Sequence, residues 1–161
     1  MTFDTRAFRS ALGSFPTGVA VVTTNVSAEH HMGITVNSFT SVSLDPPLVL
    51  WCIDRKSNRF EAFTHAKQYT ISLLDTAHET ISARLAKQGA HSLDGIDLLK
   101  TDLGPPALSD ALAFFECESE AVHQGGDHAI LVGRVLRFAR REAGEPLVFY
   151  KGKYGALATA H

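Results

Sequence analysis

The stretch from Met32 to Ser57 constrains the fold most strongly, because two strand-like runs there flank a rigid turn at Asp45-Pro46-Pro47. Proline fixes φ and removes a backbone donor, and an aspartate side chain hydrogen-bonds within its own turn. The run from Thr35 to Leu44 mixes Val, Phe and Leu with Thr, Asn and Ser, whereas Leu48 to Ile53 is almost wholly apolar. This pattern predicts two adjacent strands, the second of them buried.

The polar residues of the first run have two interpretations. Hydroxyls and an Asn amide outnumber what an ordinary strand needs, and short neutral groups suit the edge of a planar, heteroatom-rich ligand. The alternative is that these residues lie on the solvent face of an antiparallel strand, where Thr and Ser are common.

Length and charge exclude several classes of protein. The 161 residues predict a single domain over 1–161, and 45% hydrophobic residues give it enough material for a core. The net charge of −2 and the lack of basic runs argue against a nucleic-acid partner.

The two cysteines and the N-terminus favour a cytoplasmic protein. Cys52 and Cys117 lie in apolar, strand-like segments, so we expect both to be buried and reduced. The first residues lack the apolar core of a signal peptide, and no apolar run reaches the roughly 18 residues of a membrane span. We therefore expect no membrane partner.

The N-terminal third predicts a helix, a strand and a loop. Apolar residues recur at helical spacing between Asp4 and Phe15, with Asp4 or Thr5 as the candidate cap and Gly13 as the end. Val19 to Thr24 predicts a strand, and Asn25 to His31 a hairpin loop. The adjacent His30 and His31 have no third ligand at metal spacing, so we expect no metal site.

A second candidate binding segment follows the hairpin. Ser57 is a good N-cap for a short helix from Phe60 to Phe63, and Lys56 and Arg59 flank it. A helix N-terminus beside basic residues is an anion site. A charged turn with ordinary capping is the alternative.

The rest of the chain predicts mainly strands. We expect a strand at Tyr69–Leu74, a capping box at Thr76–Glu79 with a helix after it, and a loop from Gln88 to Pro106. Further predicted segments are a strand at Phe115–His123, a tight turn at Gln124–Asp127, and strands at His128–Phe138, Pro146–Tyr150 and Lys153–Leu157, the last two closing the sheet. About seven short strands with a few short helices indicate a mainly β, antiparallel barrel.

Four stretches of the chain resemble the motifs of a known protein family. They are G-I-T-V-N-S-F-T-S-V-S-L-D-P-P-L-V in the central stretch, F-P-T-G-V-A-V-V-T-T (Phe15–Thr24), G-D-H-A-I-L-V-G-R-V (Gly126–Val135) and P-L-V-F-Y-K-G-K-Y-G (Pro146–Gly155). Together they resemble the short-chain flavin reductase family, the reductase components of two-component flavin-dependent monooxygenases, over nearly the whole chain from about Phe8 to Gly155.

The resemblance implies a fold and a set of ligands. The fold would be the antiparallel split β-barrel of FMN-binding, flavin reductase-like proteins with a few short flanking helices, usually a homodimer with flavin sites at or near the subunit interface. The cofactor would be FMN or FAD, with NADH or NADPH as hydride donor. A monooxygenase component would receive the reduced flavin.

The resemblance also implies roles for residues. Hydroxyls and backbone amides of the central motif would bind the flavin, the segment after it would bind phosphate, and the Gly126–His128 turn would border the nicotinamide. The cofactor-binding candidates are Thr35, Val36, Asn37, Ser38, Ser41, Val42, Ser43, Lys56, Ser57, Arg59, Gly126, Asp127 and Tyr154.

His128 is the candidate catalytic residue. It follows two glycines and an aspartate, which lets backbone and ligand approach closely, and the alternative is a structural histidine at a strand start. Hydride transfer itself needs no general acid, so the predicted role is to position or polarise the substrate.

Two functional hypotheses remain. The favoured one is an NAD(P)H:flavin oxidoreductase, and the alternative is a flavin-binding electron-transfer protein of the same fold without NAD(P)H turnover. No G-x-G-x-x-G or Walker motif is present. A hydrolase is disfavoured because the adjacent side chains of Asp127 and His128 are expected to diverge on a strand.

Overall fold

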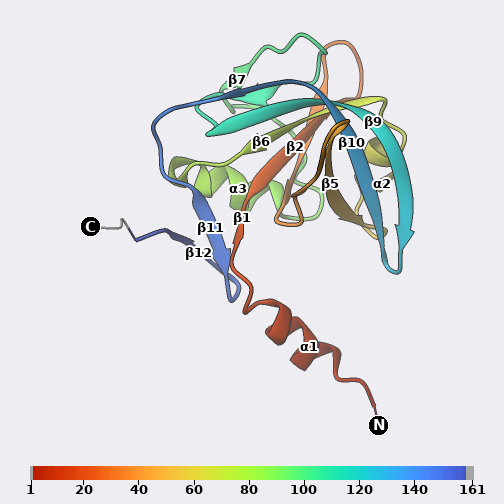
Figure 1. Cartoon of the computed structure of the whole chain (residues 1–161), viewed down its shortest axis with the longest axis vertical. Helices are drawn as coiled ribbons and strands as arrows, with labels where there is room; N and C mark the ends of the chain where they lie inside the picture. Colours follow the sequence, from red (N-terminus) through yellow and green to blue (C-terminus); the bar gives the residue numbers. More distant parts are fainter. Residues whose placement is uncertain (1, 159–161) are drawn as a thin grey trace.

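A computed structural model describes residues 2–158 and shows a mainly β protein with antiparallel pairing throughout its sheets (Figure 1). The helices are α1 (Thr5–Leu12), α2 (Phe60–Thr64) and α3 (Glu79–Leu85), with a 3-10 turn, η1 (Thr76–His78). The strands are β1 (Thr17–Gly18), β2 (Ala20–Asn25), β3 (His31–Val36), β4 (Thr40–Leu44), β5 (Pro47–Asp54), β6 (Gln68–Leu73), β7 (Leu98–Leu99), β8 (Ala107–Leu108), β9 (Ala113–Gly125), β10 (His128–Arg140), β11 (Leu147–Tyr150) and β12 (Lys153–Ala156).

The main sheet has seven strands in the order β3-β2-β6-β9-β10-β5-β4. β3 and β4 are therefore its two edges, yet only residues 37–39 separate them in the chain. Because so short a link spans at most about 14 Å, the sheet must curl until its edges approach each other. No ladder joins β3 to β4 or β5 among residues 2–158, so the curled sheet keeps a seam, as expected for a split barrel.

The predicted first strand of the central stretch was wrong in one respect. The run Thr35–Leu44 is divided between β3 and β4, and the predicted hairpin is formed by β4 and β5 alone, with Ser41 paired to Val49 and Leu44 to Pro47. The alternation of residue types continues through the link, so the pattern alone cannot reveal that the chain changes from one edge of the sheet to the other.

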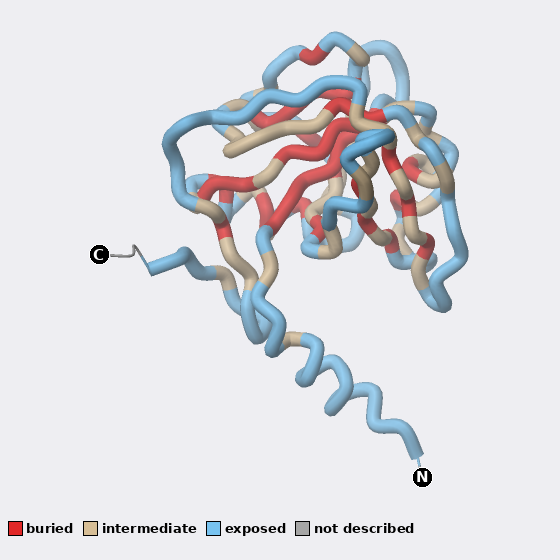
Figure 2. The backbone as a smooth tube through the Cα atoms, in the orientation of Figure 1, coloured by how far each residue is buried: buried red, intermediate tan, exposed pale blue. Residues whose placement is uncertain are grey.

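The core lies inside the curled sheet. Alternate residues of β5 face inward, and Trp51 packs edge-on against Phe63 of α2 and Tyr69 of β6, with ring centroids 5.2 and 5.7 Å apart. These three side chains are fully buried. Figure 2 shows the buried backbone concentrated in the central strands. Burial of such large aromatic side chains provides much of the stabilisation of this fold.

The C-terminal strands do not close the main sheet, contrary to the prediction. β11 pairs with β12 and β1 in a separate three-stranded sheet, because Thr17 lies opposite Phe149. α1 extends from this sheet away from the rest of the molecule (Figures 1 and 2). Asp4 caps α1 as predicted, accepting from the backbone N–H groups of Arg6 and Ala7, but no residue of the helix is buried.

The capping box before α3 begins one residue earlier than predicted. Asp75, not Thr76, is the cap: its carboxylate accepts from the backbone N–H of Ala77, and Nδ1 of His78 accepts from the backbone N–H of Asp75. Asp75 also accepts from Arg141 at 2.5 Å and from the backbone N–H of Glu145 at 3.1 Å. One carboxylate thereby joins the start of the helical segment to the loop between β10 and β11.

The cysteines follow the prediction in part. Both thiols are free, and Cys117 is buried in β9, whereas Cys52 on β5 is only half-buried. None of the helices formed by residues 2–158 combines the length and the apolarity needed to cross a bilayer.

Candidate active site

A cavity opens in the seam between the two ends of the curled sheet. Its volume is about 580 Å³, within the roughly 300–1,000 Å³ range of small-molecule sites. β3 forms one wall and β5 the other, and segments after α3 and at the β9–β10 turn complete it. The lining residues are Ile34, Thr35, Val36, Asn37, Ser38, Cys52, Ile53, Asp54, Ser57, Arg59, Ala86, Gln88, Gly125, His128 and Ile130.

Ser38 fixes the link that crosses the seam. Its hydroxyl accepts from the backbone N–H of Cys52 at 2.9 Å and lies 3.3 Å from the Cys52 carbonyl oxygen, to which it donates. Thr40 is paired with Leu50, so the Ser38 side chain continues the β4–β5 ladder by one step. Ser38 therefore holds the cavity wall, and its hydroxyl is already engaged in both directions.

Asn37 is the freest polar group of the link. Its side chain is exposed, lines the cavity and makes no hydrogen bond to any residue within 2–158. A primary amide offers two donors and one acceptor oxygen, so Asn37 can bind a heteroatom edge without losing an internal contact.

Thr35 and Tyr154 meet at α3. The Thr35 hydroxyl donates to the Ser82 carbonyl oxygen at 2.8 Å, and the Ser82 hydroxyl shares a hydrogen bond of 2.8 Å with the Tyr154 hydroxyl. Tyr154 and Phe149 line a smaller cavity of about 180 Å³ that shares Thr35, Val36, Asn37 and Ala86 with the larger one. Tyr154 therefore lines the smaller cavity and does not line the larger one.

Arg59 is buried, with only 2% of its surface exposed. Its Nη1 donates to the Leu85 carbonyl oxygen at 2.7 Å, and its Nη2 donates to the Lys87 carbonyl oxygen. Nε is buried without a partner among the described residues, and desolvation lowers the pKa of the guanidinium. Two of the three guanidinium nitrogens predicted to bind a phosphate therefore donate to carbonyl oxygens at and just after the end of α3, and the third, Nε, is buried.

Ser57 and Lys56 form the turn before α2. The prediction of Ser57 as helix cap was wrong, because Arg59 occupies the N-cap position and makes no side-chain cap. The Ser57 hydroxyl instead accepts from the Arg59 backbone N–H at 3.2 Å. Ser57 lines the cavity; Lys56 does not, although its carbonyl oxygen accepts from the Gln88 side chain.

The β9–β10 turn brings His128 to the cavity. Gly126 has φ of +70°, a conformation that glycine adopts without strain, and Gly126-Asp127 form a two-residue turn closed by Gly125 and His128. His128 lines the cavity, whereas Gly126 and Asp127 do not. The expectation that Asp127 and His128 diverge was wrong: Asp127 Oδ1 lies 2.7 Å from His128 Nδ1, because Asp127 belongs to the turn rather than to the strand.

The structure does not bring Ser41, Val42 and Ser43 to this cavity. They belong to the edge strand β4, where Ser41 and Val42 are exposed and Ser43 is half-buried. Polar residues on an exposed edge also limit pairing with other chains, so their composition has a structural explanation.

Sequence reasoning missed the opposite wall. Cys52 and Ile53 were interpreted as part of a buried strand, and the sequence analysis did not make Asp54, Ala86, Gln88, Gly125 or Ile130 candidate site residues. Only the register, which places Ile130 opposite Cys52, shows that these side chains share one face.

No group of three His, Cys, Asp or Glu side chains is placed to hold a metal ion in the described part of the chain. His31 is hydrogen-bonded to Asn25 at 2.6 Å and His30 to Ser27 at 3.1 Å, so both belong to the β2–β3 hairpin.

The family model described as flavin reductase like domain matches residues 12–158. The chain belongs to the flavin reductase-like family. It is 47% identical over 155 residues to the FMN reductase (NADH) SmoA of Agrobacterium fabrum, covering 96% of this chain and 87% of that protein. It is 36% identical to the flavin-dependent monooxygenase reductase subunit HsaB of Rhodococcus jostii, covering 96% of this chain and 78% of that subunit.

A solved member of the family has the same fold. The NADH:FAD oxidoreductase SgcE6 of Streptomyces globisporus C-1027, in complex with NAD and FAD fragments, superposes with a TM-score of 0.90 at 33% identity, covering 98% of this chain and 97% of that one. The flavin reductase-like fold of this chain is therefore confirmed, with its seam cavity as the candidate site.

Proposed function

We propose that this protein is an NAD(P)H:flavin oxidoreductase that reduces FMN or FAD and supplies reduced flavin to a partner monooxygenase. The observation that carries the proposal is the seam cavity, whose size and mainly neutral lining fit a planar, polar-edged ring. The relatives named above support it, since their names describe NADH-dependent flavin reductases and a monooxygenase reductase subunit.

The lining fits a flavin in two respects. Ile34, Val36 and Ile130 provide apolar surface for a ring, and Asn37 provides unpaired donors and an acceptor for its heteroatoms. Ser57 and Gln88 form a polar end suited to a phosphate. A bound flavin would supply hydride acceptance, which no side chain provides.

The protein's own residues would then position the reactants. Asn37 and Ser38 hold one edge of the seam, Arg59 fixes the segment after α3, and His128 presents its ring beside the cavity. Such positioning brings reacting atoms to about 3–3.5 Å and replaces the need for a dedicated dinucleotide fold. We assign cofactor binding to Thr35, Val36, Asn37, Ser38, Ser57 and Arg59, and substrate positioning to His128.

NADH consumption at 340 nm, with and without added FMN, FAD or riboflavin, tests the proposal. Turnover that requires added flavin supports it and ranks the flavins, and replacing NADH with NADPH ranks the donors. Flavin binding without oxidation of either donor would instead favour the electron-transfer alternative.

We also propose a homodimer located in the cytoplasm. Exposed apolar side chains occur on β4, on the second half of β10 and on α1, among them Leu44 at 95% exposure, Phe138 and Phe8. A second subunit would cover such surface, and the free thiols suit a reducing compartment. Light scattering coupled to gel filtration tests the assembly; a monomer at micromolar concentration would contradict it.

A further inference from the structure

The β9–β10 turn holds two side chains in contact, Asp127 and His128, of which only His128 has a role in the proposed reaction. Asp127 is 86% exposed in its side chain and does not line the cavity, yet its Oδ1 lies 2.7 Å from Nδ1 of His128. His128 is 43% exposed in its side chain and lines the cavity. The carboxylate therefore reaches the ligand site only through the imidazole.

The turn is held in place independently of this contact. The Arg55 backbone N–H donates to the Asp127 carbonyl oxygen at 2.9 Å, and Arg55 Nε donates to the Gly126 carbonyl oxygen at 3.1 Å. The Arg55 guanidinium also lies 5.6 Å from the centroid of the Phe60 ring. These bonds tie the backbone of Asp127 and His128 to the segment after β5. The contact between the two side chains is therefore not needed to hold the turn in place.

The chemistry of the pair determines where the imidazole proton resides. An ionised carboxylate only accepts hydrogen bonds, so the nitrogen it contacts must carry the proton. The hydrogen bond to His128 lowers the pKa of Asp127 below its usual value, which keeps that carboxylate ionised near neutral pH. With Nδ1–H facing Asp127, the neutral ring leaves Nε2 as an acceptor, and protonation converts Nε2 into a donor.

We propose that Asp127 is a positioning residue that fixes the tautomer and orientation of His128, so that Nε2 rather than Nδ1 is presented to the nicotinamide nucleotide. This inference rests on the proposed function for its kinetic consequence, but the tautomer can be measured on the protein alone. Asp54, the cross-strand partner of His128 on β5, also lines the cavity, but its carboxylate accepts from the backbone N–H of Lys56 and makes no hydrogen bond with the His128 ring.

The first test is ¹⁵N NMR of the histidine rings at a pH where they are neutral. A spectrum of His128→Gln identifies the His128 signals among those of the eight histidines. We expect wild-type His128 to carry its proton on Nδ1, and Asp127→Asn to shift the population toward Nε2–H, because the amide can donate to Nδ1 as well as accept from it. A wild-type ring protonated on Nε2 overturns the inference whether or not the protein reduces flavin.

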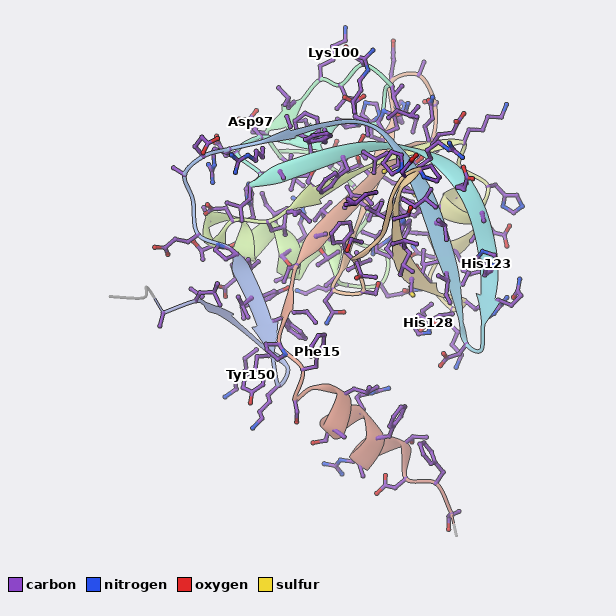
Figure 3. All side chains as sticks on the ribbon, in the orientation of Figure 1. Phe15, Asp97, Lys100, His123, His128 and Tyr150 are labelled. Carbon is purple, nitrogen blue, oxygen red and sulfur yellow. The ribbon has the colours of Figure 1, made fainter. Side chains whose placement is uncertain are left out.

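The second test is kinetic. Asp127→Asn should raise the KM for NADH about tenfold, the effect of weakening one charge-assisted hydrogen bond, with flavin affinity unchanged. Asp127→Glu should raise the KM for NADH less than Asp127→Asn does, since it retains the carboxylate. Asp97→Asn is the matched control, because Asp97 is exposed at the opposite end of the molecule from His128 (Figure 3).

The outcomes separate the two proposals. Wild-type protein that fails to oxidise NADH contradicts the proposed function but leaves the tautomer assignment to NMR. Active wild-type enzyme whose Asp127→Asn variant keeps both its KM and its Nδ1–H tautomer overturns the positioning role.

Discussion

The Nη1 of Arg59 donates to the carbonyl oxygen of Leu85 at 2.7 Å, which joins the start of α2 to the last residue of α3. A second bond, to the carbonyl oxygen of Lys87, extends this contact two residues past the last residue of the helix. Since the last carbonyls of a helix lack intrahelical partners, one buried guanidinium both caps α3 and fixes the Ala86–Gln88 wall of the cavity.

Replacing Arg59 with Lys should therefore destabilise the protein by about 2–4 kcal/mol, because lysine keeps the charge but cannot bond both carbonyls in one plane. Urea unfolding measures the change. Arg84→Lys is the control, since Arg84 also donates to backbone carbonyls of Ser92 and Asp94 but is exposed. Equal losses of unfolding free energy in the two variants would mean that burial of Arg59 does not account for its contribution to stability.

Asn37→Ala should weaken flavin binding about threefold to tenfold without lowering stability, because the amide has no internal partner to lose. Fluorescence titration with FMN and FAD measures affinity, and thermal melting measures stability. Asn58→Ala serves as a control, being an exposed asparagine outside the cavity wall. Unchanged affinity in Asn37→Ala would remove this residue from the site.

His128→Ala should raise the KM for NADH or lower kcat while the flavin dissociation constant stays within about twofold, because the ring contributes positioning rather than flavin anchoring. The control is His123→Ala on the same hairpin (Figure 3), since His123 is exposed and does not line the cavity. Wild-type kinetics in His128→Ala would exclude it from the reaction.

Cys52 should be alkylated slowly, and bound flavin should slow the reaction further. Desolvation raises the pKa of Cys52, so little thiolate is present at pH 8 and the rate should rise as pH increases. Cys117 is buried, with its pKa raised to about 12, and should not react in the folded protein. Mass spectrometry after iodoacetamide treatment distinguishes the two thiols; labelling of Cys52 at equal rates with and without flavin would argue against binding in the seam.

Asp75 should make stability depend on pH. Backbone hydrogen bonds, the first from Ala77, hold the pKa of Asp75 below its usual value, so its contribution is present above the unfolded pKa of about 3.9 and is lost as pH falls through the lower folded pKa. Asp75→Asn should cost about 1–3 kcal/mol at pH 7, and its deficit should shrink toward pH 3. The comparison is with Asp94→Asn, an exposed carboxylate; a deficit that does not change with pH would contradict the assignment.

Local patterns predicted most strands and helices but not the arrangement of the central stretch. The hairpin around Asp45-Pro46 and the Asp4 cap follow from short-range chemistry, which acts over a few residues. The division of Thr35–Leu44 between two edges depends on pairing with β2 and β5, which lie far apart in the sheet. Strand periodicity contains no information about which neighbour a strand will find.

The same limit explains which residues of the site could be predicted from the sequence and which could not. Seven predicted residues line one cavity: Thr35, Val36, Asn37, Ser38, Ser57, Arg59 and His128. Ser41 and Ser43 have the same chemistry but lie on the edge strand β4, outside the cavity lining. Cys52 and Ile130 resemble core residues until the register places them on the seam-facing side of β5 and β10.

The three-residue link between the sheet's edges has a consequence for the order of folding. Local hairpins such as β4–β5 and β9–β10 can pair early, but the seam exists only after β2, β6, β9, β10 and β5 are all in place. The cavity is therefore complete only when the whole sheet has formed, and chains with unpaired strands lack it. A ligand held there would bind only the completed fold. By mass action, a larger cellular supply of that ligand would lower the unfolded fraction of the protein and so slow its degradation.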